Sequence, residues 1–369
     1  MKKKICIVTW YTSSNCGTCL QARALYEVIK SKYDVCMLHG RRKYSIFSIR
    51  DWRIVAYKVI KKIKDYNKKS TDIITISEER QEKIDAFSKE SYEFLYFTSR
   101  RKYKKMENDV DCFVVGSDQL WNPYWYDGKY YLDFVNDSNK KKSYATSIGI
   151  SELPQNVKKK MRKHLKEFST ITVREKKASE LLTNLLERSD IEVVADPTFL
   201  LTGDEWRMIY KNKSKVTKLD KKYLICYFVG GMSEHKEAVE NIAQKLQLEI
   251  VVIPMNNKDY TVENVVFEEA GPYEFLDLID NAEYVCTDSF HALAISLSMS
   301  KNFSVFERKI TRYGASQNSR IDELLMKYSL QESKYNEHIG TISRIDYKKV
   351  QEQMQLERQK SRNKLFGML

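Results

Sequence analysis

Apolar and polar residues along the chain alternate in a pattern that predicts repeated β-α units. The first unit is a β-rich apolar run at 4–10, a polar loop at 11–18, a helix with apolar spacing at 20–30 and a second strand at 33–39. From residue 109 the alternation resumes, with strands predicted over 109–116, 142–149 and 169–175 and helices over 154–168 and 175–187. Such alternation indicates a parallel sheet covered by helices on both faces.

The pattern then restarts after a polar segment at 202–221, which we interpret as a junction. Beyond it the sequence predicts a helix ending near residue 246, another helix over 272–281, and buried strands beside them. At 369 residues the chain exceeds the size at which a single core usually stops growing. We therefore predict an α/β protein with two Rossmann-like, doubly wound domains that face a cleft.

The predicted boundaries follow these breaks in the pattern. Residues 1–201 form the N-terminal domain, which includes a basic helical insertion at about 41–105 with a helix over roughly 77–94. Residues 202–345 form the C-terminal, donor-binding domain. Residues 346–369 form a last helix that packs back on the N-terminal domain, with a free solvated helix as the alternative.

Charge narrows the choice of partner. The 63 Lys and Arg residues against 50 Asp and Glu give a net charge of +13, which favours anionic partners. Residues 41–69 predict a basic amphipathic helix, which either lies on an acidic membrane surface or packs its apolar stripe on the domain. Nucleic acid is not expected, because the aromatic residues are not clustered on a recognisable binding module.

Targeting and cysteine usage predict a cytoplasmic protein without a signal peptide, attached at most peripherally to the inner face of the cell membrane. No apolar run reaches the roughly 18 to 20 residues of a membrane span. Seven cysteines, an odd number, mostly lie in strand-like runs, as buried thiols do in a reducing compartment. Cys16 and Cys19 form a lone C-x-x-C, for which a redox role is the alternative; no second pair exists for a metal.

One candidate site follows the strand at 109–116, in the sequence VVGSDQLWNP. An acid, two amides and an indole arrive directly after a glycine turn, at Asp118, Gln119, Trp121 and Asn122. Open α/β sheets bind ligands outside the carboxyl ends of their strands, which is where these side chains should lie. A tight turn in which Asp118 satisfies local amides is the structural alternative.

A second candidate site is EYVCTDSFHALAISL, where a buried strand leads into a helix. Ser289 and His291 fall in the first turn, where free amides and the helix dipole favour a phosphate, and Asp288 is a candidate N-cap. His291 is a candidate for acid-base chemistry because its ordinary pKa lies near neutrality. The loop containing Asn15 and Gly17, before the first helix, has a composition suited to an anion as well.

Several blocks together resemble the polysaccharide pyruvyl transferase family. They are NCGTCLQARAL, GSDQLWNP, SYATSIG, TVREKKASELL, ADPTFLL, GPYEFLDLIDNAEYVCTDSFHALAISL and NSRIDELL, and they cover the chain from about residue 5 to residue 330. The resemblance implies a GT-B-like fold. It also implies transfer of the enolpyruvyl unit of phosphoenolpyruvate onto a sugar, which leaves a pyruvate ketal in surface-polysaccharide biosynthesis. The expected acceptor is a saccharide linked to polyprenyl diphosphate or to a nucleotide, and no cofactor is expected.

This activity requires an acid, a base and cations, and the resemblance gives each candidate a role. His291 is the expected acid or phosphate ligand, and Asp118 is the expected base. Arg174 and Arg320 would clamp the phosphate or carboxylate of the donor bidentately, helped by Ser289, Asn15 and Gly17. Gln119, Trp121 and Asn122 would orient the sugar, although Trp121 is equally consistent with core packing.

The sequence departs from the family pattern at one position. Some branches carry an arginine two positions before the histidine, where this chain has Ser289. Either Arg320 or Arg312 then supplies the missing cation, or the donor differs. The alternative function is a GT-B glycosyltransferase that uses a nucleotide-sugar donor.

Overall fold

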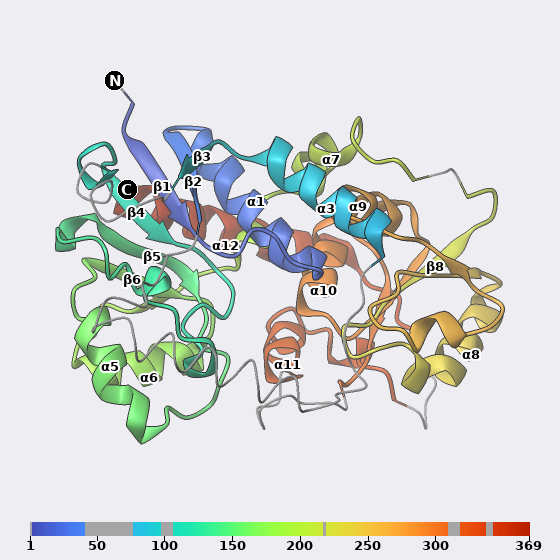
Figure 1. Cartoon of the computed structure of the whole chain (residues 1–369). Coiled ribbons are helices and arrows are strands. Elements are labelled where there is room, and N and C mark those ends of the chain that lie inside the picture. The colour runs from blue at the N-terminus through green and yellow to red at the C-terminus, as the bar shows by residue number, and fades with distance from the viewer. Residues whose placement is uncertain (1, 41–76, 97–105, 217–218, 309–317, 337–341) are drawn as a thin grey trace, which may run out of the picture.

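Two parallel sheets, one from each half of the chain, form the framework of the protein (Figure 1). The structure is a computed structural model that describes residues 2–40, 77–96, 106–216, 219–308, 318–336 and 342–369. The predicted insertion helix at 41–69 lies outside the described residues, as does Arg312. Among the described helices, none combines the length and apolar character needed to cross a bilayer.

The N-terminal sheet has seven strands in the order β3-β2-β1-β4-β5-β6-β7, and every pairing is parallel. The strands are β1 (Lys4–Val8), β2 (Asp34–His39), β3 (Phe94–Tyr96), β4 (Cys112–Val115), β5 (Lys141–Thr146), β6 (Thr170–Val173) and β7 (Glu192–Val193). The helices of this half are α1 (Cys16–Lys30), α3 (Glu78–Ser91), α5 (Gln155–Leu165) and α6 (Lys176–Leu186). The short edge strand β3 lies inside the predicted insertion and was not predicted.

The C-terminal sheet has five strands in the order β10-β9-β8-β11-β12, again all parallel. They are β8 (Tyr223–Tyr227), β9 (Glu249–Val252), β10 (Val266–Phe267), β11 (Tyr284–Thr287) and β12 (Phe303–Val305). Its helices are α8 (Lys236–Leu246), α9 (Pro272–Asn281), α10 (Phe290–Ser298) and α11 (Asn318–Lys327). The predicted fold class, two doubly wound parallel α/β domains, is confirmed; the exact domain boundaries stay a prediction.

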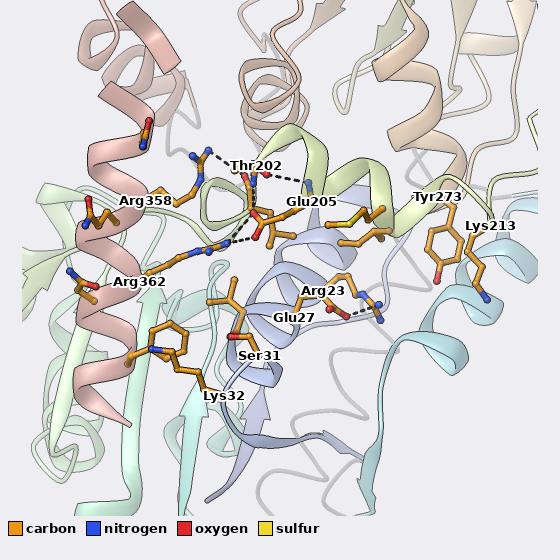
Figure 2. Close-up of a pocket in the computed structure, with 18 of the residues that line it drawn as sticks. Arg23, Glu27, Ser31, Lys32, Thr202, Glu205, Lys213, Tyr273, Arg358 and Arg362 are labelled. Atoms are coloured by element: carbon orange, nitrogen blue, oxygen red, sulfur yellow. Dashed lines mark hydrogen bonds and ion pairs between the residues drawn. The ribbon is translucent and has the colours of Figure 1, made fainter. Parts of the chain in front are cut away.

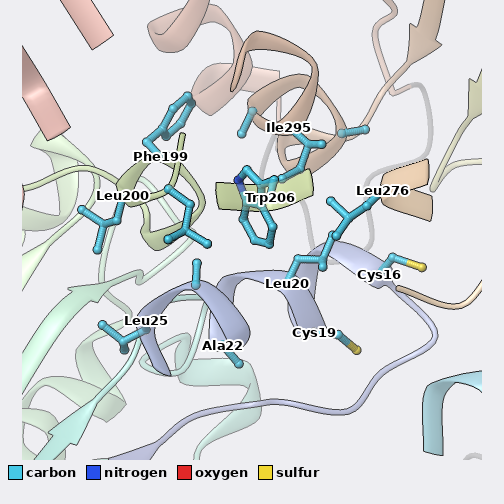
Figure 3. Close-up of a cluster of buried hydrophobic side chains, with 14 of the residues drawn as sticks. Cys16, Cys19, Leu20, Ala22, Leu25, Phe199, Leu200, Trp206, Leu276 and Ile295 are labelled. Atoms are coloured by element: carbon cyan, nitrogen blue, oxygen red, sulfur yellow. The ribbon is translucent and has the colours of Figure 1, made fainter. Parts of the chain in front are cut away.

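The segment expected to be a polar junction contains a helix. Thr202 and Glu205 form a capping box that starts α7 (Gly203–Tyr210). This helix buries Trp206, whose indole nitrogen donates a hydrogen bond to the Thr198 carbonyl. Figure 3 shows Trp206 between Leu20 of α1 and Ile295 of α10, within a hydrophobic core that includes residues of both sheets.

The last helix, α12 (Tyr347–Met368), lies against the N-terminal domain (Figure 1). Ser361 accepts a hydrogen bond from the Ala195 amide at 3.0 Å, and Arg362 donates one to the Leu200 carbonyl at 2.9 Å. Lys3 reaches the carbonyl of Leu369. The chain thus returns from the second sheet to the first, and the two halves are held together by more than one connection.

Candidate functional site

A cavity of about 510 Å³ lies between the carboxyl ends of the two sheets. Its walls include Asp118, Gln119 and Asn122 from one domain and Ser289, His291 and Arg320 from the other. The strand order reverses direction at β1 and at β8, and the loops that follow both strands also line the cavity. Open α/β sheets bind ligands at such switch points, so the topology alone selects this region.

Asp118 is held in an unusual backbone conformation at the end of β4. Its φ is 75°, in the left-handed region that residues with a side chain seldom adopt. Thr18 donates to one carboxylate oxygen at 2.8 Å and the Gln119 amide donates to the other at 2.8 Å. Strained conformations of this kind persist where the surroundings over-determine them, and they cluster at functional sites. Asp118 therefore accepts a local amide, as the turn alternative predicts, and it also lines the cavity, as the site interpretation predicts.

Behind Asp118 lies a buried ionic cluster centred on Arg174. Its guanidinium contacts Asp196 at 2.7 Å and Glu175 at 3.0 Å, and Nη2 lies 3.8 Å from Asp118 without a hydrogen bond. Burial works to lower the pKa of Arg174, but the three carboxylates outweigh it and raise that pKa. Arg174 does not line the cavity, and Phe290 lies between them, with its ring 5.2 Å from the guanidinium carbon. The predicted clamp on the donor is therefore not preformed at Arg174.

Asp196 organises this cluster. One carboxylate oxygen accepts from Ser117 and from Arg174, both at 2.7 Å, and the other accepts from the amide and hydroxyl of Thr198. Burial tends to raise the pKa of Asp196, but Arg174, His291 and these hydrogen bonds outweigh it and lower the pKa to about 2. The residue is therefore a carboxylate at neutral pH.

His291 lies in the first turn of α10 and lines the cavity. Its Nε2 is 3.9 Å from Asp196 Oδ2, and this buried nitrogen has no hydrogen-bond partner. Burial lowers the pKa of His291, and the negative charges of Asp196 and Asp118 only partly oppose that shift. The lowered pKa therefore favours the neutral ring at pH 7, with Nε2 buried beside the Asp196 carboxylate.

Gly17 has a different role from the predicted one. A Cβ atom placed on Gly17 would lie 2.3 Å from His291 Cβ, so α1 and α10 can meet only because this residue has no side chain. The Gly17 amide is bonded to Asn15 Oδ1 at 3.0 Å, and the Cys16 amide is bonded to the Tyr227 hydroxyl at 3.2 Å. This helix end is already capped, which corrects the expectation of an open anion site at Asn15 and Gly17.

Arg320 is one of the two arginines that the sequence offers in place of the cation missing at Ser289. It lines the cavity and forms no ion pair with any described residue. Burial lowers the pKa of Arg320 to about 10, and the Arg174 cation adds to this effect. Arg308, the other arginine of the cavity wall, contacts Asp288 at 3.0 Å. Ser289, not Asp288, is the N-cap of α10, since its hydroxyl accepts from the Ala292 amide.

Trp121 is buried in the core and does not line the cavity. Its side chain is 0% exposed, packs against Phe168 and donates a hydrogen bond to the Tyr130 carbonyl. Trp10 and Trp125, whose ring centroids are 5.7 Å apart, line the cavity instead. The alternative of core packing is correct for Trp121, and the aromatic wall comes from residues that the sequence reasoning passed over.

Arg80 of α3 was also missed. Its guanidinium donates to the Ser14 carbonyl at 2.9 Å and to the Pro254 carbonyl at 2.5 Å, which joins one loop of each domain at the cavity rim. No local signal marks this role, because Arg80 lies in a helix of ordinary polar composition. Asp196 and Trp10, in contrast, lie just beyond the observed strands β7 and β1, at the edge of the sheet where ligands bind. The apolar pattern had placed Trp10 inside the first predicted strand, at 4–10.

The C-x-x-C pair has none of the features of a redox site. Cys16 and Cys19 are both free thiols buried in the core, and burial raises the pKa of each. Reactive thiols require a lowered pKa and access to solvent. No group of His, Cys, Asp and Glu side chains suited to a metal ion occurs among the residues described here.

A larger cavity of about 1410 Å³ lies elsewhere, between α1, α7 and α12 (Figure 2). Part of its charge is paired, Arg23 with Glu27 at 2.6 Å and Arg362 with Glu205 at 2.8 Å. No sequence-predicted site residue lines it. The smaller cavity is therefore the candidate active site.

Comparison with known proteins identifies the family. The glycosyltransferase SnogD from Streptomyces nogalater superposes with a TM-score of 0.49 at 10% identity, over 100% of both chains. The UDP-GlcNAc 2-epimerase from Neisseria meningitidis gives 0.46 at 13% identity, over 98% of this chain and 100% of that chain. No curated protein matches the sequence significantly. The family model for polysaccharide pyruvyl transferase matches residues 15–309, and the chain belongs to that family.

Proposed function

We propose that this protein transfers the pyruvyl unit of phosphoenolpyruvate to a sugar and forms a cyclic ketal in surface-polysaccharide biosynthesis. The acceptor is a saccharide carried on polyprenyl diphosphate or on a nucleotide. One observation carries the proposal: Arg320, which has no ion-pair partner among the described residues, shares a cavity with the imidazole of His291 and the carboxylate of Asp118.

The donor requirements match one half of the cavity. Phosphoenolpyruvate carries a phosphate and a carboxylate, and a guanidinium binds either group bidentately. The amino end of α10, at Ser289, adds the partial positive charge of a helix terminus. Because Arg320 has no carboxylate partner among the described residues, an anionic ligand would relieve its repulsion from Arg174.

The proposed reaction begins when His291, as imidazolium, gives a proton to the methylene carbon of the donor and creates an oxocarbenium-like centre. A sugar hydroxyl bonds to this centre as Asp118 accepts its proton. The bond to phosphate then breaks, and a second hydroxyl of the same sugar closes the ketal. Of the two hydroxyl protons, one restores the acid and the other leaves with inorganic phosphate.

The other half of the cavity suits the acceptor. Trp10 and Trp125 offer aromatic surface to the apolar face of a sugar ring. Gln119 and Asn122 are joined by one hydrogen bond at 3.0 Å, and the Gln119 amide nitrogen is left for a sugar hydroxyl. Asp118 lines the same cavity as this wall and His291, so a base is available for that hydroxyl.

The test is a reaction of the purified protein with phosphoenolpyruvate and a panel of polyprenyl-diphosphate-linked and nucleotide-linked saccharides. We expect release of inorganic phosphate that depends on the acceptor, and a product heavier by one pyruvate ketal in mass spectrometry. His291→Ala and Asp118→Asn should each abolish turnover with the fold intact by circular dichroism. Thermal stabilisation by a nucleoside diphosphate but not by phosphoenolpyruvate would instead support glycosyl transfer and overturn the proposal.

A further inference from the structure

Helix α5 carries a dense run of positive charge. Six basic residues and no acidic residue occur between positions 158 and 166. Lys159, Arg162, Lys163 and Lys166 are exposed and fall at the i, i+3, i+4, i+7 spacing of a single helix face, which we call the basic face. The opposite side of the helix buries Met161 and Leu165 in the core of the N-terminal domain.

The protein itself hardly neutralises the basic face. Arg162 pairs with Glu187 at 2.8 Å, but no described residue forms an ion pair with Lys159, Lys163 or Lys166. Like charges four residues apart on a helix repel each other, as Lys159 and Lys163 do. The carbonyl end of α5 favours the cations of its last turn, but of the basic face only Arg162 has a carboxylate partner among the described residues, so much of this repulsion remains. An external anionic surface would offset it.

The basic face belongs to a helix that begins at the cavity rim. Ile150 lines the cavity, and Gln155, five positions later, is the first residue of α5. Lys160 of α5 lies 3.3 Å from the ring centroid of Tyr126, which directly follows the cavity residue Trp125. Figure 1 shows α5 on the outer side of the N-terminal domain, away from the C-terminal sheet.

We propose that the basic face binds the headgroups of anionic phospholipids and holds the N-terminal domain on a membrane surface. The basic residues lie along a convex helix and not in a groove, which suits a flat bilayer better than a strand of nucleic acid. The inference goes beyond the proposed function and rests on separate observations. A saccharide on a polyprenyl carrier would meet the cavity at the bilayer surface.

The experiment measures binding of the full-length protein to phosphatidylcholine vesicles with and without phosphatidylglycerol, by co-sedimentation. The variant Lys159→Glu/Lys163→Glu/Lys166→Glu reverses three charges of the basic face. The control, Lys348→Glu/Lys349→Glu/Lys360→Glu, makes the same change of net charge at exposed positions of α12. Because each basic residue near an anionic bilayer strengthens binding about fivefold, the first variant should lose on the order of 100-fold in affinity. The control should lose much less.

Three results would overturn the inference: equal binding to neutral vesicles, an equal loss in the control, or binding to duplex DNA but not to either vesicle. If the Glu variant fails to fold, Lys159→Gln/Lys163→Gln/Lys166→Gln replaces it in the same measurement, because neutral side chains relieve the repulsion within α5. Binding of phosphoenolpyruvate should be unchanged in all variants. Loss of vesicle binding with unchanged donor binding separates this surface from the active site, so failure of one proposal leaves the other standing.

Discussion

Asp118 and Asp196 lie in two loops and His291 in the first turn of α10, far apart in the sequence, and their side chains form one electrostatic unit. Asp196 fixes Arg174, and its charge partly offsets the desolvation of His291. Neither effect requires direct contact with a ligand. At the scale of the residue, the site is an imidazole whose protonation depends on what occupies the cavity beside it.

The first prediction concerns the proton on His291. Burial keeps the pKa of His291 below its ordinary value, so the ring is neutral at pH 7 in the empty site. An anionic donor beside the ring favours the charged form and raises that pKa. Binding of phosphoenolpyruvate at pH 7 should therefore take up protons, measured by calorimetry in buffers of different ionisation enthalpy. His291→Gln should abolish the uptake and Ser289→Ala should retain it; the same uptake in both variants would contradict the prediction.

The second prediction concerns Asp196 and acid stability. Its pKa is about 2 in the folded protein against 3.8 for an ordinary aspartate, so its stabilisation is present above pH 4 and is lost as the pH falls toward 2. Asp196→Asn should lower the free energy of unfolding by about 2 kcal/mol at pH 7, with the difference shrinking below pH 4. Urea unfolding across pH measures this.

A surface pair provides the control for Asp196. Asp190 contacts Arg188 at 2.5 Å but is 61% exposed, and exposed ion pairs contribute at most about 1 kcal/mol. Asp190→Asn should therefore cost less than Asp196→Asn at neutral pH. A loss in Asp196→Asn that is the same at every pH would show that packing and not charge is responsible.

At the scale of the element, the site depends on how closely α1 and α10 approach. The first turns of these two helices meet at Gly17 and His291. Helix α1 follows strand β1 of the N-terminal sheet, and α10 follows strand β11 of the C-terminal sheet. The helix starts were predictable only to within a few residues: the first helix was expected from residue 20 but begins at Cys16 after its cap Asn15, and Asp288 was expected to cap α10, which Ser289 caps instead. The contact between the helices was not predictable, because a helix boundary carries no information about its distant neighbour.

The third prediction follows from this contact. Gly17→Ala places a methyl group 2.3 Å from His291 Cβ, so either the helices separate or the imidazole moves. Misplacement of a catalytic group by about 1 Å costs roughly 100-fold in rate. We expect a loss of this size in kcat for Gly17→Ala. Gly367→Ala, in α12, adds a methyl group that meets no atom within 4 Å and should keep full activity. Equal activity of the two variants would contradict the prediction that catalysis depends on the close approach of α1 and α10.

At the scale of the whole molecule, one hydrophobic core joins the two domains. It includes Leu20 of α1, Trp206 of α7 and Ile295 of α10 (Figure 3), together with Met354 of α12. The ion pair between Arg362 of α12 and Glu205 of α7, in the larger cavity, adds to the contact between these helices. We therefore expect the domains to unfold together.

The fourth prediction tests this shared core through α12. Met354 is 2% exposed, and Met354→Ala should lower the free energy of unfolding by about 2–5 kcal/mol. Leu356, two residues away, is 71% exposed, and Leu356→Ala should change it by less than about 0.5 kcal/mol. Tryptophan fluorescence and circular dichroism should follow a single urea transition, and Met354→Ala should shift it as one. Two separate transitions would contradict a shared core.

Local patterns were sufficient to predict most of the elements and where their polar loops lie. The helix predicted over 272–281 is α9 (Pro272–Asn281), and α8 ends at Leu246 as expected. These succeed because apolar periodicity and capping chemistry act within a few residues of one another. The short strands β3 and β10 were missed, because two or three residues carry too little pattern.

The sequence by itself determined the fold class, the family and the segments that contain Asp118 and His291. Strand ends and helix starts depend on residues within a few positions of one another, so a local pattern is enough to predict them. Only the tertiary structure decided that Trp121 is buried while Trp10 lines the cavity. It also decided that Arg174 pairs with Asp196 outside the cavity, and that the absence of a side chain at Gly17 leaves room for His291. Each of these depends on a partner far along the chain. Burial and charge pairing between distant segments are properties of the packed molecule, and no window of sequence contains both partners.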